Sequence, residues 1–254
     1  MNNNTCTAIG KVFFALAILC IGIIHFVQHN FPVALVPVPE IPHKIIFVYI
    51  SGGCLIISAL LILSNKFTTI GAWVAFVIWL IDLLALQLPL LLAAPKNGGA
   101  WAATFETAML VAGSLLLMGT SHTATKKPVL TFAGRYLFAS AMLVFAVQHY
   151  IYAEYIASLI TAWMPFKLFL TYLVGVGFLA VAISIIINKF VQPAGIALGA
   201  MFLLWFFILH LPLVFSHLHV EAQWTSLFFV LGSSGEAFLI AGSAIKSSKR
   251  LKHK

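Results

Sequence analysis

The chain has 254 residues, of which 62% are hydrophobic and only 8% are charged, and its mean hydropathy is +1.08. This composition excludes an ordinary soluble globular domain, in which about a quarter of the residues are charged. The formal net charge of +8 would suggest nucleic acid as the partner of a soluble protein. In so apolar a chain, membrane topology explains the charge more simply, so we expect a lipid bilayer as the partner and no nucleic acid.

Apolar runs recur along the chain at close to the roughly 20 residues that a helix needs to cross a bilayer core. Backbone polar groups in lipid must be satisfied within each segment, which favours helices and leaves no place for an open sheet. We therefore predict an all-α integral membrane protein with eight transmembrane helices. The expected spans are 11–28, 44–63, 69–93, 101–119, 133–153, 166–187, 193–215 and 223–245.

The second half of the chain repeats the first. When His25 is placed on His149, a constant shift of 124 residues also places Gly10 on Gly134. One residue of slippage in the segment that follows changes the shift to 123. The pairs that then coincide include Pro42/Pro165, Tyr49/Tyr172, Gly52/Gly175, Asn65/Asn188, Pro89/Pro212 and Trp101/Trp224. A period of this length indicates duplication of a complete unit and not a short solenoid repeat.

This duplication predicts two tandem four-helix bundles, each half being mainly its own bundle. The predicted domains are a polar N-terminal segment at 1–9, a first four-helix repeat at 10–119, a cytoplasmic linker at 120–132, a second repeat at 133–245 and a basic cytoplasmic tail at 246–254. Each half has an even number of helices, so both copies have the same orientation. A pseudo-twofold axis along the membrane normal should therefore relate them.

The basic residues predict which way the protein lies in the membrane. Of the 14 lysines and arginines, 11 fall at the ends that eight spans place on one side, and three fall on the other. The positive-inside rule then puts both termini in the cytoplasm. In this orientation all six acids and seven of the nine histidines lie at mid-depth or on the outer side, so the titratable chemistry faces outward.

Three acids fall inside predicted membrane helices: Asp82, Glu106 and Glu236. A carboxyl group at that depth is costly, which makes it a functional-site hypothesis by default. The alternative is a hydrogen-bonded carboxyl that tightens helix packing. Asp82 aligns with Trp205 and is private to the first half, whereas Glu106 and Glu236 fall one residue out of register when similar Ala- and Gly-containing stretches of their helices are superposed.

The histidines offer weaker patterns. His25 and His29 are four residues apart on a helix and could present two imidazoles to one metal, but the second copy does not repeat the pair. His217, His219 and Glu221 resemble a surface metal clip, for which a solvated loop is the plainer interpretation. The repeated His25/His149 pair is more informative, and predicts either a ligand-binding residue or a hydrogen bond that ties the outer segment to the bundle.

Several motifs of the second half resemble the DoxX family of four-helix membrane proteins. They are Gln148-His149-Tyr150, Trp163-Met164-Pro165, Leu209-His210-Leu211-Pro212 and the segment from Glu221 to Trp224-Thr225, and the first half carries degenerate versions of them. The family is named after a small membrane subunit linked to quinone-dependent sulfur oxidation. The resemblance therefore implies a tandem duplication of a DoxX-like unit in a cell inner membrane, and it identifies a fold and not a reaction.

The leading functional hypothesis is an accessory subunit that binds a quinone or another small apolar molecule in an outward-facing cavity, with a redox protein as partner. A proton-coupled or small-solute transporter and a metal-dependent enzyme at the outer face are the alternatives, and enzymatic activity stays open. We expect the second half to hold the ligand, with His149 and His210 beside the cavity and Glu236 as its floor. The candidate ligand-binding residues are His149, Tyr150, His210, Glu236, His25, Glu106 and Asp82.

Overall fold

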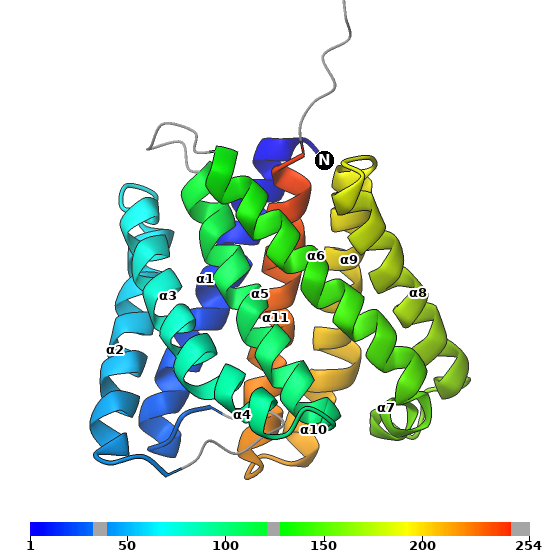
Figure 1. The fold of residues 1–254 in the computed structure, drawn as a ribbon, viewed down its shortest axis with the longest axis horizontal. Helices are drawn as coiled ribbons and strands as arrows, with labels where there is room; N and C mark the ends of the chain where they lie inside the picture. Colours follow the sequence, from blue (N-terminus) through cyan, green and yellow to red (C-terminus); the bar gives the residue numbers. More distant parts are fainter. Residues whose placement is uncertain (33–39, 121–127, 245–254) are drawn as a thin grey trace, which may run out of the picture.

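The computed structural model describes residues 1–32, 40–120 and 128–244. Over these ranges every regular element is a helix, and eight helices are long and apolar enough to cross a membrane, which confirms the predicted fold class (Figure 1). These spans are Asn3–Gln28, Lys44–Leu63, Thr68–Ala93, Gly98–Thr120, Pro128–Ile151, Lys167–Ile186, Val191–Ser216 and Glu221–Gly242. The predicted tail at 246–254 and most of the predicted linker at 120–132 lie outside the described residues.

The elements follow one plan in the two halves. The first half contains α1 (Asn3–Gln28), α2 (Lys44–Leu63), α3 (Thr68–Asp82), η1 (Leu83–Gln87), α4 (Leu88–Ala93) and α5 (Gly98–Thr120). The second half contains α6 (Pro128–Ile151), α7 (Ala153–Leu159), α8 (Lys167–Ile186), α9 (Val191–Trp205), η2 (Phe206–His210), α10 (Leu211–Ser216) and α11 (Glu221–Gly242).

Two of these helices, α1 and α6, begin eight and five residues before the start that the hydropathy pattern predicts. The Asn2 side chain accepts a hydrogen bond from the backbone N–H of Thr5 at 2.8 Å, so α1 is capped at its first residue and the polar segment 1–9 is mostly helical. Pro128 opens α6, where a missing N–H costs nothing. An N-cap residue and an N-terminal proline thus extend these helices into polar sequence that the hydropathy pattern leaves out.

Each half contains one π-helical turn, η1 or η2, just before a proline. Pro89 lacks an N–H, and in a regular helix its ring would collide with the carbonyl of Ala85. The chain widens instead, and the N–H of Leu88 donates to the carbonyl of Leu83, five residues back. Leu211 and Phe206 make the equivalent bond before Pro212. The proline pair therefore places two matching π turns near the same end of the molecule.

The two halves are interleaved and do not form separate bundles. Helix α1 packs most extensively on α11 and α2, and α5 packs most extensively on α6 and α3, while α1 and α5 barely touch. The two last helices of the halves, α5 and α11, are central, since 78% and 67% of their most apolar stretches are buried, against 44% or less in the other spans. The expectation that each half is mainly its own bundle is therefore wrong.

Glycines explain this exchange of partners. A Cβ atom added to Gly10 of α1 would lie 2.6 Å from the carbonyl oxygen of Gly235 in α11. One added to Gly134 of α6 would lie 2.9 Å from that of Ala112 in α5. Gly10 and Gly134 are repeat counterparts, as are Ala112 and Gly235. The same close crossing, which needs small residues, is thus built twice, each time between the first helix of one half and the last helix of the other.

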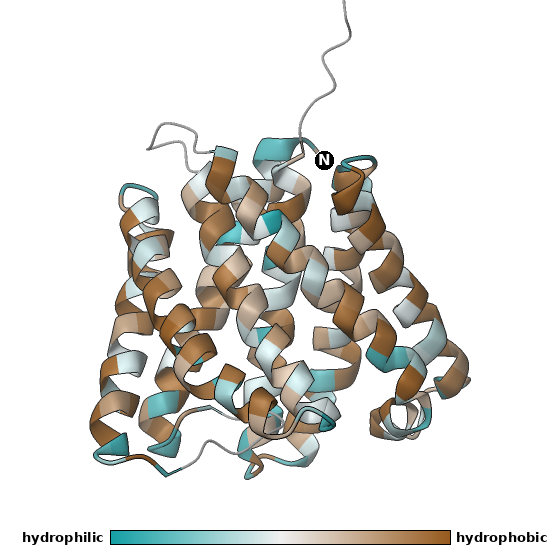
Figure 2. Cartoon of the chain, viewed as in Figure 1, coloured by the Kyte–Doolittle hydropathy of each residue, from teal (hydrophilic) through white to brown (hydrophobic). Residues whose placement is uncertain are grey.

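Both ends of the described chain lie at the same end of the bundle, where the side-chain amide of Asn3 donates to the Ala244 carbonyl at 2.7 Å (Figure 1). Following the predicted orientation, we call this the inner end, and the end with α4, α7 and α10 the outer end. Polar residues gather at the two ends, and the long helices between them are mainly hydrophobic (Figure 2). Large apolar side chains such as Ile46, Val77 and Ile183 are exposed on them, as a lipid-facing surface requires.

Candidate ligand cavity

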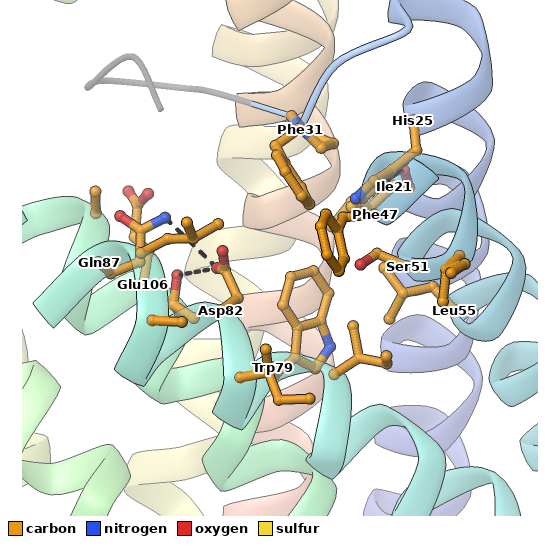
Figure 3. Close-up of a pocket in the computed structure, with 18 of the residues that line it drawn as sticks. Ile21, His25, Phe31, Phe47, Ser51, Leu55, Trp79, Asp82, Gln87 and Glu106 are labelled. Atoms are coloured by element: carbon orange, nitrogen blue, oxygen red, sulfur yellow. Dashed lines mark hydrogen bonds between the residues drawn. The ribbon is translucent and has the colours of Figure 1, made fainter. Parts of the chain in front are cut away.

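A cavity of about 400 Å³ lies in the first half, toward the outer end, between α1, α2, α3 and α5 (Figure 3). Most of its wall is apolar or aromatic, and includes Ile21, Phe31, Phe47, Leu55, Ile78 and Trp79. The polar side chains of the wall are His25, Ser51, Asp82, Gln87, Glu106 and Thr107. An apolar pocket with a few convergent polar groups is the usual form of a small-molecule site.

Asp82 is the best-connected polar group of the wall. Its Oδ2 atom accepts hydrogen bonds from the hydroxyl of Thr107 at 3.3 Å and from the amide of Gln87 at 3.5 Å (Figure 3). The π turn η1 contributes to this arrangement, because its wider turn brings positions five residues apart onto neighbouring parts of the helix surface. Glu106 lines the same cavity from α5, so two carboxyl groups face one space at membrane depth.

His25 and Trp79 supply two further polar atoms. The Nδ1 atom of His25 lies 2.8 Å from the carbonyl oxygen of Ile21, so Nδ1–H donates and the neutral ring keeps Nε2 as an acceptor. Gly52 allows α2 to cross α1 at this histidine, since a Cβ there would lie 2.7 Å from that of His25. The buried indole N–H of Trp79 has no hydrogen-bond partner among the described residues.

The cavity lies next to the lipid-facing surface of α2 and α3. Phe47, Ile50 and Ile81 line it and are also 51%, 54% and 57% exposed. Figure 1 shows α3 leaning away from α2 toward the outer end. At the outer side the lining includes Phe31, Pro32 and Ile41, which flank the stretch 33–39 that the structure does not describe.

The repeat explains why this cavity belongs to the first half. The counterparts of Leu55, Trp79 and Asp82 are Phe178, Phe202 and Trp205. These three rings pack on one another with centroids 5.8 to 6.4 Å apart. His149, the counterpart of His25, meets Phe178 edge to face at 5.1 Å. Larger side chains therefore occupy in the second half the space that Leu55 and Asp82 leave open in the first.

The structure brings together three of the seven predicted site residues, His25, Asp82 and Glu106, around this cavity. The other four lie elsewhere. His149 donates to the Phe145 carbonyl, Tyr150 stacks on Tyr172 with centroids 5.6 Å apart, and His210 is in η2 with its Nδ1 buried. The geometry thus favours the first half as the ligand-binding half. The larger number of polar residues had favoured the second half.

Glu236 lies at the centre of the molecule and not on the floor of the cavity. It is 0% exposed, and neither carboxyl oxygen has a hydrogen-bond partner in the described part of the chain. A Cβ added to Gly113 would lie 2.9 Å from the Glu236 Cγ. Gly113 is also the repeat counterpart of Glu236 at the shift of 123, so the contact joins two equivalent positions of the repeat. The near-register alignment of Glu236 with Glu106 was therefore wrong by about two helical turns.

The outer histidines do not form a metal site in the described ranges. His29 bonds to the Tyr49 hydroxyl at 2.7 Å, away from His25, whose Nδ1 is bonded to its own helix. Across residues 1–32, 40–120 and 128–244, no three His, Cys, Asp or Glu side chains are placed to hold a metal ion together. The metal-dependent enzyme therefore has no ligand set in this part of the chain.

Sequence reasoning missed Trp79, Gln87 and Thr107 as lining residues. Two signals could have indicated Gln87 and the position of the cavity. Pro89 predicts a widened turn that brings Gln87 toward Asp82, and the exchange of Trp205 for Asp82 between the repeats marks the place where volume is lost.

Comparison with known proteins gives no relative: no family model, no curated protein and no solved structure matches the chain.

Proposed function

We propose that the protein binds a small, mainly apolar molecule with a hydrogen-bonding head, of the quinone or quinol class, in the cavity between α2, α3 and α5. The observation that carries this proposal is that a partly polar cavity shares the wall residues Phe47, Ile50 and Ile81 with the lipid-facing surface. A ligand dissolved in the bilayer can enter there and leave its apolar tail among the lipids. In this proposal the chain is a DoxX-like accessory subunit of a cell inner membrane.

The polar atoms of the wall match what a quinone or quinol head presents. A quinone offers two carbonyl oxygens, for which the Trp79 indole N–H is a free donor among the described residues. A quinol offers two hydroxyl groups, which can donate to the Nε2 atom of His25 and to the carboxylate of Asp82 or Glu106. The cavity of about 400 Å³ is within the range of small-molecule sites.

The same two acids also suit the proton-coupled transporter that the sequence allowed. The position of the cavity next to the lipid-facing surface favours a ligand that partitions into the membrane over a water-soluble solute.

Filling the cavity tests the proposal. Leu55→Phe introduces at this position the residue that its repeat counterpart, Phe178, provides. We expect it to weaken binding of decylubiquinone to the purified protein in lipid nanodiscs by at least about tenfold, which corresponds to about 1.4 kcal/mol. Binding is measured by titration and by mass spectrometry of the retained quinone.

Phe178→Leu is the matched control, because it makes the reverse exchange in the other half and should leave quinone binding unchanged. A wild-type protein that retains no quinone, or a Leu55→Phe variant that binds it as well as wild type, would contradict the proposal.

A further inference from the structure

A second cavity, of about 640 Å³, lies at the inner end, where α1 and α6 begin and α5 and α11 end. It is separate from the ligand cavity and its role does not depend on the function proposed above. Arg135 of α6 lines it and is only 2% exposed. A guanidinium group buried this deeply requires a compensating partner, because an unpaired charge away from water is costly.

The described residues satisfy only part of Arg135. Its Nη2 donates to the side-chain oxygen of Asn188 at 2.6 Å, and this amide is neutral. The other terminal nitrogen, Nη1, is buried without a hydrogen-bond partner in the described part of the chain. Within the same ranges the one ion pair joins Lys44 to Glu40 at the opposite end. In Arg135, Nη2 is therefore hydrogen-bonded and Nη1 is not.

Comparison with the first half shows which part of Arg135 has a structural role and which part is left to bind a ligand. Its counterpart Lys11 bonds to Asn65, the counterpart of Asn188. Both asparagines have positive φ, 61° and 54°, in the turn between the second and third spans of their halves. The basic residue thus holds this turn in both halves, and only one nitrogen of Arg135 is needed for it. The second nitrogen has no equivalent in Lys11.

In the described ranges no carboxyl group forms an ion pair with Arg135. Five of the six acids belong to the outer part of the molecule, and Glu236 is seven residues before Ser243 at the cavity, or about 10 Å along α11. The neighbouring stretches 121–127 and 245–254 contain seven lysines and arginines and no acid. The charge at this end would attract anions from solution or from the membrane surface.

Two helix N-termini complete the site. In the first turn of α1 the Thr5 N–H is already bonded to the Asn2 side chain, so the N–H groups of Asn3 and Asn4 remain. In α6 Pro128 has no N–H, and those of Val129 and Leu130 have no carbonyl partner within the helix. The dipoles of both helices favour an anion at these ends. The hydroxyls of Thr7, Thr120 and Ser243 already donate to backbone carbonyls. The other donors of the lining are Arg135 Nη1, these backbone amides and the side chains of Asn2, Asn4 and Thr131. Phe132 lines the cavity while 42% exposed, so the site also borders the lipid-facing surface.

We propose that the inner cavity binds a phosphate-bearing anion through the Nη1 atom of Arg135 and the N-terminal amides of α1 and α6. The phosphate comes either from the headgroup of an anionic lipid or from dissolved phosphate.

The test measures the thermal unfolding midpoint of the full chain in detergent as short-chain phosphatidylglycerol or inorganic phosphate is added, with phosphatidylcholine of the same length as reference. A ligand that binds the folded state raises the midpoint. Arg135→Gln keeps a donor for Asn188 and removes the charge, so we expect an apparent affinity at least about tenfold weaker. Lys11→Gln removes the same charge in the other half and should keep the wild-type response.

The titrations with phosphatidylglycerol and with inorganic phosphate identify the source of the anion. A response to phosphatidylglycerol alone indicates a lipid headgroup, and a response to inorganic phosphate as well indicates a general phosphate site. If Arg135→Gln does not fold, Asn4→Trp, which narrows the cavity from an exposed position, should weaken binding in its place. A wild-type protein that responds to neither ligand, or variants that respond like wild type, would overturn the proposal.

Discussion

Single residues decide where the two halves of this protein differ. At the shift of 123, Asp82 stands where the second half has Trp205, and Gly113 stands where it has Glu236. The first exchange opens a cavity, and the second makes room for a carboxyl group at the centre of the molecule. In both pairs the smaller residue belongs to the first half. The first half therefore has the space for a ligand beside Asp82 and for the Glu236 side chain beside Gly113.

Gly113→Ala tests the space for the Glu236 side chain. The added methyl carbon would lie 2.5 Å from Cε2 of Phe14 and 2.9 Å from Cγ of Glu236, and both side chains are fully buried. We expect destabilisation of about 1–3 kcal/mol, the usual cost of overpacking, measured as a lower unfolding midpoint in detergent. Gly177→Ala is the control, because nothing lies within 4 Å of its added Cβ. Equal stability of the two variants would show that Gly113 is not in a close contact.

At the scale of elements, the π turns show what the sequence could and could not predict. Pro89 and Pro212 were evident as a repeated pair, but their effect depends on the hydrogen bonds that a proline removes. The register of α5 and α11 was mispredicted because their Ala- and Gly-containing stretches superpose at more than one shift. The contacts of Gly10 and Gly134 settle the register, and such contacts between distant helices cannot be read from one sequence.

Pro89→Ala restores an N–H for the Ala85 carbonyl and should convert η1 into regular helix. Gln87 would then rotate away from Asp82, so we expect quinone binding to weaken by about three- to tenfold, which is the size of one ordinary hydrogen bond. Pro212→Ala makes the same change in the second half, away from the cavity, and should bind as wild type does. Weakening by both variants would assign the prolines to the overall fold and not to the site.

At the scale of the whole molecule, the spans and the duplication were predictable, since both follow from the apolar runs and the spacing of identical residues. The exchange of helices between the halves was not, because a membrane helix with small residues can pack on any neighbour that presents a matching face. The cavity in the first half was not predicted, for a related reason. Polar residues are more numerous at the outer end of the second half, whereas a cavity depends on the volume of apolar neighbours such as Leu55 and Phe178.

The exchange predicts that neither half is stable alone. When residues 1–120 are produced without the rest, the face of α1 at Gly10 and the face of α5 at Ala112 lose their partners on α11 and α6. We expect this fragment to be degraded or to form a homodimer in which a second copy supplies those faces. Produced together with residues 121–254, it should co-purify as a one-to-one complex whose molar mass is measured by light scattering in detergent. A folded monomer of residues 1–120 would contradict the exchanged arrangement, because its α1 and α5 would then have to pack on each other, a contact that is almost absent from the intact chain.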